Sequence, residues 1–353
     1  MVGAGPAGSA AAIRLLRRRR DLTGRVLLID KAFFPRHKLC AGGITRRAEA
    51  ALATIGATMP ATAVNVTSVE LRLRSGTETI RAGKTWPDYI FRVIQRNTFD
   101  HSLVCDAANC GAVVHEGEGV KGVAATSNAV TITSDRREYR ARVAIAADGA
   151  NSLVRRRLGL SRPVCLGAAG EALIPAKPDM PTDRDGRVTH AVFDFGPALH
   201  GFQGYYWEFP TISKDVAMVS AGVADSRIFD RQSRRSVVAE LRERCNGQLR
   251  SGPTSHRAKG APMRWFHPYA RQSAHRMVFA GDAAGADPLF GEGISSALEF
   301  GIYAADAVVQ ALDRSDFSFS GYDQALSHSS LGSTLNAKLA LARRFYARLN
   351  ASA

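Results

Sequence analysis

No stretch of the 353-residue sequence approaches the roughly 18 consecutive apolar residues that a membrane-spanning helix needs, and no charged-then-apolar leader opens it. With 45% hydrophobic residues the chain is long enough to bury a sizeable core. The sequence therefore predicts a soluble, cytoplasmic protein. A peripheral contact with the inner face of the membrane stays open as an alternative.

Cysteine is scarce, and its five positions are scattered without a CxxC pair: Cys40, Cys105, Cys110, Cys165 and Cys245. This pattern argues against a disulfide framework and against a zinc site. The nine histidines show neither HExxH nor another paired ligand spacing, so we expect no metal. Four of the cysteines are interpreted as small core or surface residues.

Negative charge is in deficit, which leaves a net charge of +15. Such an excess of arginine can attract phosphates, a nucleic acid or an anionic membrane. The arginine runs at 17–20 and 155–157 fall at predicted helix ends, where cations are favoured or simply solvated. Because no basic motif with interleaved aromatics is present, we expect no nucleic-acid partner.

The most informative motif lies at the start of the chain. Gly3, Gly5 and Gly8 form GxGxxG, residues 9–16 suit a helix, and residues 25–29 suit a buried strand that ends at Asp30. In such a turn the glycines allow a sharp bend and close approach to a pyrophosphate, and the acidic residue accepts ribose hydroxyls. The segment therefore predicts a βαβ dinucleotide unit.

Only Met1 and Val2 precede the glycine turn, although a central parallel strand of about five residues normally stands there. Loss of that strand leaves the neighbouring strand edges unpaired in a buried position. We therefore expect the true start to lie upstream. The alternative is that the fold tolerates a missing central strand.

Two further buried strands are predicted at 143–147 and 277–280, and each runs into a polar turn. The segments 62–91 and 165–260 instead alternate with period two, which is typical of antiparallel strands with one solvated face. The predicted fold class is α/β: a Rossmann-like nucleotide-binding domain with a parallel sheet, interrupted by a β-rich substrate domain. The expected nucleotide-binding domain comprises 1–61, 92–164 and 261–313, the β-rich domain 62–91 and 165–260, and a helical tail 314–353.

Residues 34–43 read Phe-Pro-Arg-His-Lys-Leu-Cys-Ala-Gly-Gly. This segment resembles PRxKxCxGG of the geranylgeranyl reductase family, within the flavoproteins related to para-hydroxybenzoate hydroxylase. Residues 96–103 resemble its RxxFDxxL helix start, and 147–152 with Arg155 resemble its second nucleotide motif. Residues 281–285, with Pro288 and 291–294, resemble its flavin motif.

The resemblance implies FAD as the cofactor. Arg36 and Lys38 are expected at its phosphate or ribityl groups, and Asp282 at its ribityl hydroxyls. A helix that begins near Gly293 is expected to stabilise the negative charge of reduced flavin. The implied FAD-binding residues are Gly3, Gly5, Pro6, Ala7, Gly8, Asp30, Lys31, Arg36, Lys38, Cys40, Ala41, Gly42, Arg96, Asp148, Gly281, Asp282, Pro288, Gly291, Gly293 and Ile294.

Two features bear on the substrate. Tyr205, Trp207, Phe209 and Pro210 resemble the family's YxWxFP segment, whose aromatics suit a long apolar chain, although an ordinary strand with a buried aromatic face gives the same alternation. Cys40 is the candidate catalytic residue, because a thiol there can donate a proton or gate flavin movement. The alternative for Cys40 is a small buried residue.

The resemblance implies reduction of C=C bonds in a hydrophobic isoprenoid chain on a lipid, quinone or pigment precursor. The sequence has no second GxGxxG for NAD(P)H, so electrons come from a transiently docking nicotinamide, a ferredoxin-like donor protein or another reductant. One alternative is a flavin monooxygenase or halogenase of the same fold that acts on an aromatic or polyketide substrate. Another is a non-catalytic protein with an FAD fold.

Overall fold

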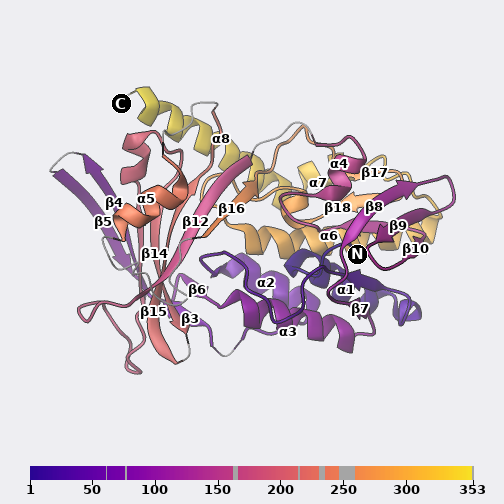
Figure 1. Cartoon of the computed structure of the whole chain (residues 1–353), viewed down its shortest axis with the longest axis horizontal. Coiled ribbons are helices and arrows are strands. Elements are labelled where there is room, and N and C mark those ends of the chain that lie inside the picture. Colours follow the sequence, from indigo (N-terminus) through magenta and orange to yellow (C-terminus); the bar gives the residue numbers. More distant parts are fainter. Residues whose placement is uncertain are drawn as a thin grey trace.

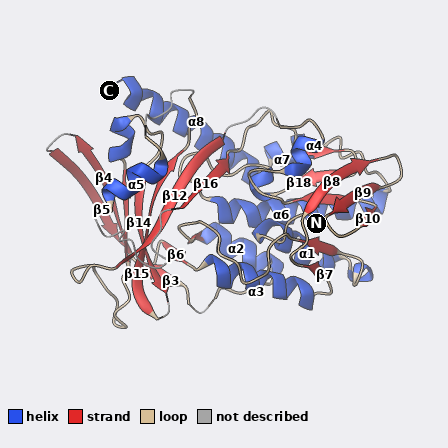
Figure 2. Ribbon diagram, viewed as in Figure 1, coloured by secondary structure: helices blue, strands red, loops and turns tan. Residues whose placement is uncertain are grey.

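The computed structural model describes residues 1–60, 62–75, 78–161, 166–213, 215–229, 235–245 and 259–351. Cys165 and residues 246–258 of the predicted β-rich segment lie outside these ranges. The molecule is elongated, with a large sheet at one end and an α/β half at the other (Figures 1 and 2). The predicted fold class is confirmed.

The α/β half is built on a parallel sheet whose strands are collected from distant parts of the chain. β1 pairs parallel with β7, β11 pairs parallel with β18, and β17 adds an antiparallel edge. The strands are β1 (Leu27–Ile29), β7 (Val113–His115), β11 (Ala144–Ala146), β17 (Ser273–Ala274) and β18 (Met277–Phe279).

Met1 and Val2 lie between the two parts of this sheet. Val2 forms parallel bridges with Ile29 on one side and Ala146 on the other. The amide of Ile29 donates to the carbonyl of Met1 (3.1 Å), and the amide of Ala147 donates to that of Val2 (2.8 Å). These two residues therefore occupy the central strand position and pair with the strand edges on both sides. A longer strand was expected at this position.

Helices pack on this sheet through small side chains. α1 and α6 can approach closely because Gly301 of α6 has no side chain. A Cβ at this position would lie 2.4 Å from the carbonyl oxygen of Ala7. The packing buries alanines of α1 completely, among them Ala10 and Ala11. The helices of this half are α1 (Pro6–Arg18), η1 (Arg20–Leu22), α2 (Arg46–Ile55), α3 (Arg96–Asn109), α4 (Leu153–Arg157), η4 (Gly281–Ala283) and α6 (Gly293–Arg314).

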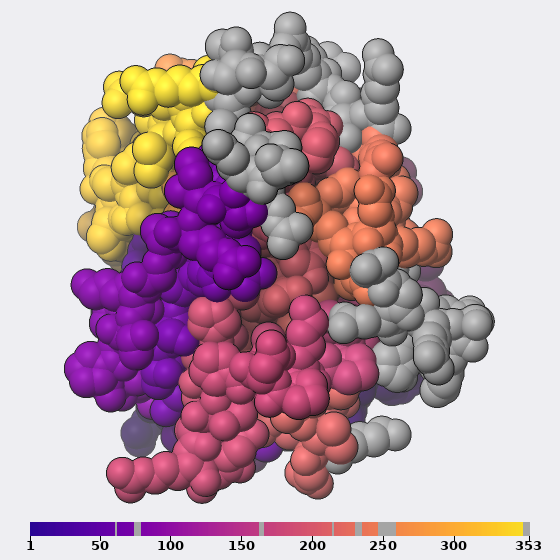
Figure 3. All heavy atoms as spheres, turned by 90° about the vertical axis from the view of Figure 1, so that its left-hand side faces the viewer, coloured from indigo at the N-terminus to yellow at the C-terminus, as the bar shows by residue number. Residues whose placement is uncertain are grey.

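The β-rich half is a seven-stranded sheet in the order β16-β12-β15-β14-β13-β4-β5, antiparallel except between β13 and β4. Part of the predicted alternation in 62–91 corresponds to β4, which pairs antiparallel with β5. Figure 3 views the molecule from this end. The strands are β4 (Ser68–Ser75), β5 (Glu78–Thr85), β12 (Leu166–Pro175), β13 (His190–Asp194), β14 (Tyr206–Ser213), β15 (Val216–Asp225) and β16 (Lys259–Arg264).

The remaining strands form two three-stranded sheets. One has the strand order β2-β6-β3 and joins the two halves, and the other has the strand order β10-β9-β8 and lies within the α/β half. The second was not anticipated by the sequence analysis. The strands are β2 (Gly43–Thr45), β3 (Val64–Val66), β6 (Phe91–Val93), β8 (Val120–Ala125), β9 (Val130–Ser134) and β10 (Glu138–Ala141).

Helix α5 (Val237–Arg244) interrupts the segment predicted to be β-rich. The Ser236 side chain caps it by accepting from the amide of Ala239 (3.1 Å), and Val237 and Leu241, one helical turn apart, bury against the large sheet. The short turn η2 (Gly196–His200) follows β13.

The predicted helical tail consists of α7 (Tyr322–His328) and α8 (Ser330–Ala351). Figure 1 shows α8 running towards the end of the molecule that carries the large sheet. Among the described residues, no helix is long and apolar enough to cross a membrane.

Candidate active site

The glycine turn leaves room for a side chain at only one of its three glycines. Gly3 has a φ of +98°, and a Cβ there would lie 2.4 Å from the carbonyl oxygen of Ala147. A Cβ at Gly8 would lie 1.9 Å from the carbonyl oxygen of Gly3. A Cβ at Gly5 would instead meet only the Arg36 guanidinium, 3.4 Å away, so Gly5 faces space that a phosphate can share with Arg36.

Asp30 follows β1 as the sequence predicts. Its carboxylate accepts from the amide of Ala4 (2.9 Å) and from that of Ala32 (2.9 Å). Each oxygen keeps a second acceptor position, so the fixed carboxylate suits a ribose hydroxyl. Lys31 and Lys38 are exposed, and neither contacts a charged partner among the described residues.

A buried ion cluster fixes the next part of the site. Arg96 holds Asp100 by two bonds of 2.8 and 2.9 Å, and Arg36 approaches the same carboxylate at 3.1 Å. Asp100 is fully buried. Burial alone lowers the pKa of Arg96, but the attraction of Asp100 and of the nearby Cys40 thiol raises it overall, so Arg96 stays charged.

The loop that carries Cys40 is held from two sides. The amide of Cys40 donates to Glu171 of the large sheet (2.8 Å), and the amide of Ile94 donates to the carbonyl of Gly42 (3.0 Å). Gly42 has a φ of +78°, and a Cβ there would lie 2.1 Å from the carbonyl oxygen of Ile94. Only glycine therefore allows this close approach.

Two carboxylates remain open to a ligand. Asp282 makes no hydrogen bond with any described residue, and one oxygen of Asp148 is buried without a partner while the other accepts from the amide of Val154 (3.1 Å). A buried acceptor without a donor is costly, so a polyhydroxyl ligand satisfies a need of this site. The chain therefore fits FAD at Asp148 and Asp282.

The flavin motif abuts the glycine turn. A Cβ at Gly281 would lie 2.8 Å from the Cβ of Ala7, and α6 begins at Gly293, as predicted. The position of a Cβ at Gly293 is 3.7 Å from a carboxylate oxygen of Asp282. Ile294 is buried in the core of the α/β half.

Arg155 supports the same motif from inside the protein. Its guanidinium donates to the carbonyls of Ala283 and Arg271 and to the side chain of Gln272 (2.6 Å). Burial and the charge of Arg264 lower its pKa to about 10. The arginine run at 155–157 lies in the last turn of α4, as expected for cations, but Arg155 is buried and binds carbonyls and the Gln272 side chain instead of solvent.

A lysine of helix α8 binds two acidic residues of the flavin motif. The Lys338 ammonium bridges Asp287 (2.8 Å) and Glu292 (2.8 Å), and Asp287 is fully buried. Burial opposes the charged forms, but the mutual attraction raises the pKa of Lys338 and lowers that of Glu292. This contact was not predicted, although a lone lysine between Leu335 and Leu339 on an apolar helix face indicates a buried acidic partner.

The aromatic segment forms one wall of the large sheet. Tyr205, Trp207 and Phe209 share a buried cluster, and the ring of Phe193 lies 5.0 Å from that of Phe209. Strand alternation places Pro210 on the opposite face, so it does not join this wall. The aromatic rings and the Cys40 loop meet, because Leu39 and Ala41 pack against the same cluster.

The wall is tied directly to the flavin motif. The hydroxyl of Tyr205 donates to the carbonyl of Phe290 (2.5 Å), and that of Ser226 donates to the carbonyl of Pro288 (2.8 Å). Burial raises the pKa of Tyr205 well above its ordinary value, so it stays a hydrogen-bond donor. The flavin motif, the Cys40 loop and the aromatic wall therefore converge on one region.

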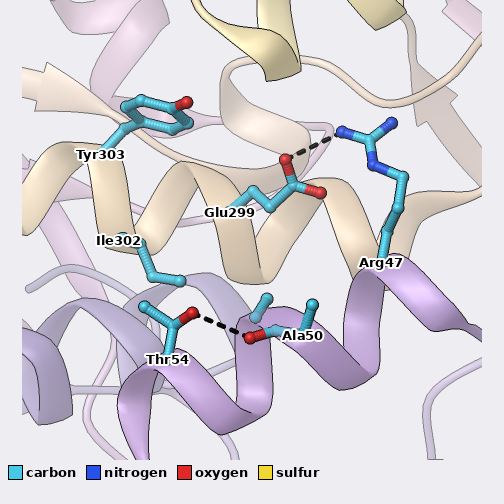
Figure 4. A pocket seen from close by; sticks show the side chains of 7 residues that line it. Arg47, Ala50, Thr54, Glu299, Ile302 and Tyr303 are labelled. Atoms are coloured by element: carbon cyan, nitrogen blue, oxygen red, sulfur yellow. Dashed lines mark hydrogen bonds and ion pairs between the residues drawn. The ribbon is translucent and has the colours of Figure 1, made fainter.

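A surface pocket of about 320 Å³ lies elsewhere, between α2 and α6 (Figure 4). An ion pair between Arg47 and Glu299 (2.8 Å) crosses it. None of the residues implied in FAD binding lines this pocket, so we do not assign it to the site. Its lining is Arg47, Ala50, Ala51, Thr54, Glu299, Ile302 and Tyr303.

Replacing Lys338 with methionine is expected to destabilise the protein, because the contacts between α8 and the flavin motif are lost. An unpaired buried charge costs about 3–5 kcal/mol, and because Lys338 is partly exposed we expect a loss of roughly 2 kcal/mol. Urea unfolding measures this loss. Arg344→Met, at an exposed position of the same helix, is the control, and equal stability of the two variants would show that the bridge contributes nothing.

Comparisons with known proteins agree with this geometry. A family model described as FAD binding domain matches residues 1–310. Menaquinone reductase of Mycolicibacterium smegmatis is 30% identical, with 87% of this chain and 75% of that protein covered. Digeranylgeranylglycerophospholipid reductase 2 of Methanosphaera stadtmanae is 28% identical, with 90% and 79% covered.

Solved structures share the fold at low identity. A geranylgeranyl bacteriochlorophyll reductase-like protein from Thermoplasma acidophilum matches with a TM-score of 0.74 and 20% identity, covering 96% of this chain and 86% of that one. The halogenase PltM matches with a TM-score of 0.69 and 14% identity, covering 92% and 72%. At these identities both likenesses establish the architecture and nothing about the reaction.

Proposed function

From the premise that this chain belongs to the FAD binding domain family and is an FAD-dependent oxidoreductase, we propose that it reduces C=C bonds of an isoprenoid chain. The resemblance to the geranylgeranyl reductase family is confirmed by its relatives. The substrate class is our inference from the site. It is a long apolar chain carried on a lipid, quinone or pigment precursor.

The FAD-binding residues proposed from the sequence keep their roles here. Gly5 and Arg36 are proposed at the pyrophosphate, Asp30 at the ribose and Asp282 at the ribityl hydroxyls. The start of α6 at Gly293 supplies unpaired backbone amides and a positive dipole end, which favour a reduced, negatively charged flavin. Lys338 and Arg155 hold the segment that presents these groups.

The chemistry needs a hydride and a proton on the two carbons of the alkene, and FAD in its reduced form supplies the hydride. The protein's own residues supply the rest. The aromatic wall excludes water and positions the apolar chain, and the Cys40 thiol donates the proton. Arg96, which lies beside the thiol, stabilises the thiolate that remains.

The observation that carries this proposal is the contact between the Cys40 loop and the aromatic wall. A Cβ at Gly43 would lie 3.7 Å from the ring of Phe209. The loop that carries the proposed proton donor therefore borders an apolar surface, while the Cys40 side chain itself packs against the core of the α/β half. The names of the relatives, a menaquinone reductase and a digeranylgeranylglycerophospholipid reductase, support the same substrate class.

The decisive test is incubation of the flavin-loaded protein with isoprenoid quinones and lipids under a chemical reductant, followed by mass spectrometry. We expect the product to gain a pair of hydrogen atoms for each reduced bond. Gain of an oxygen or halogen atom on an aromatic substrate, with consumption of O2, would instead support a monooxygenase or halogenase. Replacing the chemical reductant with NAD(P)H or with a ferredoxin-type protein, and comparing the rates of product formation, then identifies the electron donor.

Replacing Asp282 with alanine is expected to weaken FAD binding by about 1–3 kcal/mol, the cost of leaving polar partners unsatisfied. Flavin titration of the apoprotein measures the change. Asp316→Ala, an exposed carboxylate with no part in the site, is the control. Unchanged affinity would mean that another residue holds the ribityl group.

A further inference from the structure

Glu171 on β12 is a carboxyl group that the proposed reaction has not yet used. In the register of the large sheet, its neighbours are Lys259 on β16 and Gly222 on β15, and the next residue across is Trp207 on β14. Because Gly222 has no side chain, the indole of Trp207 covers it: a Cβ there would lie 2.0 Å from the indole. Glu171 therefore stands beside the aromatic wall.

The carboxyl group binds the Cys40 loop. One oxygen accepts from the amide of Cys40 (2.8 Å), and the other accepts from the hydroxyl of Ser220 (2.8 Å). The indole of Trp207 also donates to Ser220, at 3.4 Å. Within the described part of the chain, no cation forms an ion pair with Glu171.

This environment disfavours the anion. Burial raises the pKa of Glu171 to about 7, although Ser220, the Cys40 amide, Arg96 and Lys259 all act to lower it. When protonated, the carboxyl group keeps both contacts, since its hydroxyl donates to Ser220 and its carbonyl oxygen still accepts from Cys40. Glu171 therefore changes charge near neutral pH without leaving the loop.

The charges around the thiol limit how many anions the site holds. Asp100 lies between two guanidiniums, since it accepts two hydrogen bonds from Arg96 and pairs with Arg36 at 3.1 Å. A thiolate at Cys40 and a carboxylate at Glu171 are two further anions close to the Arg96 guanidinium. Like charges in a partly buried site disfavour each other, so ionisation of one group favours the protonated form of the other.

We propose that Glu171 is a positioning residue that holds the Cys40 loop and carries the proton that restores the Cys40 thiol after each reduction. The inference rests on the proposed function for its place in the cycle. Bound FAD would supply the hydride to the alkene, and the thiol donates the proton, which leaves a thiolate. The S–H bond forms again as the carboxyl O–H of Glu171 breaks, and the carboxylate then takes a proton from water.

The test measures the charge coupling itself, without turnover. Flavin-loaded protein is alkylated with iodoacetamide in a series of buffers from acidic to alkaline pH, and the rate at Cys40 is read by peptide mass spectrometry. Removal of the neighbouring anion in Glu171→Gln favours the thiolate, so we expect alkylation at neutral pH to be about tenfold faster. Glu171→Asp keeps the charge and should retain the parental pH profile more closely.

Glu208→Gln is the matched control, because Glu208 lies on β14 and bonds Tyr206 on the opposite face of the sheet. Its alkylation profile should coincide with that of the parent. Coincidence of the Glu171→Gln profile as well would overturn the inference. A protein that shows the coupling but reduces no isoprenoid would keep the link between Glu171 and Cys40, and would remove the proposed function together with the place of this proton in its cycle.

Thermal unfolding supplies a second measurement that does not depend on the thiol. Since the folded pKa of Glu171 is raised from 4.5 to about 7, its contribution to stability is complete below the unfolded value and is lost as pH rises through the folded value. The difference in melting temperature between Glu171→Gln and the parent should therefore shift in favour of the variant between acidic and alkaline pH. A constant difference would contradict the assignment.

Discussion

Gly5→Val is expected to yield a folded protein that no longer retains FAD. The valine side chain has room in the protein itself, since the nearest atom to a Cβ at Gly5 is a terminal nitrogen of the flexible Arg36 side chain. The same space is where the backbone of a glycine turn approaches the pyrophosphate. The loss is measured as missing visible flavin absorbance in protein whose circular dichroism is unchanged.

Gly8→Ala is the informative comparison, because a Cβ at Gly8 would lie 1.9 Å from the carbonyl oxygen of Gly3. This variant must shift α1 against the turn, so it should lose both stability and FAD. The two substitutions thus separate ligand clearance from packing within one motif. Full flavin occupancy in Gly5→Val would show that the pyrophosphate does not pass over Gly5.

Local patterns predicted the elements that carry the FAD motifs. The spacing of apolar residues predicted α1 and β1, which both follow the glycine turn, and buried runs predicted β11 and β18. These elements follow from contacts close in the sequence and from backbone requirements such as the positive φ of Gly3. The alternation of β4 likewise predicted an antiparallel pair.

Long-range partners were not predictable in the same way. The bond between Glu171 and Cys40 joins residues 131 positions apart, and that between Lys338 and Asp287 joins residues 51 apart. Sheet register and helix docking bring these pairs together only in the folded protein, so the position of Lys338 on an apolar helix face indicates a buried partner without identifying it. The burial of Arg155 was equally unpredictable. Its partners include the carbonyl of Arg271, which is far away in the sequence.

Cys40→Ser is expected to leave FAD bound but to slow alkene reduction by about 10²–10⁴-fold, the usual contribution of a positioned general acid. A serine hydroxyl is similar in size to the thiol but a far weaker acid. The amide of residue 40 still donates to Glu171, so the loop should keep its position. Reduction of the bound flavin should be nearly unchanged, because that half-reaction does not require the thiol.

Stopped-flow measurement of the two half-reactions separates these effects, with the isoprenoid substrate supplied in detergent or liposomes. Cys105→Ser is the control, since Cys105 is an exposed thiol on α3. Equal rates of substrate reduction in the parent and in Cys40→Ser would remove Cys40 from the reaction. Loss of FAD from Cys40→Ser would instead identify the thiol as a packing group of the cofactor site, because its charge partner Arg96 remains in place.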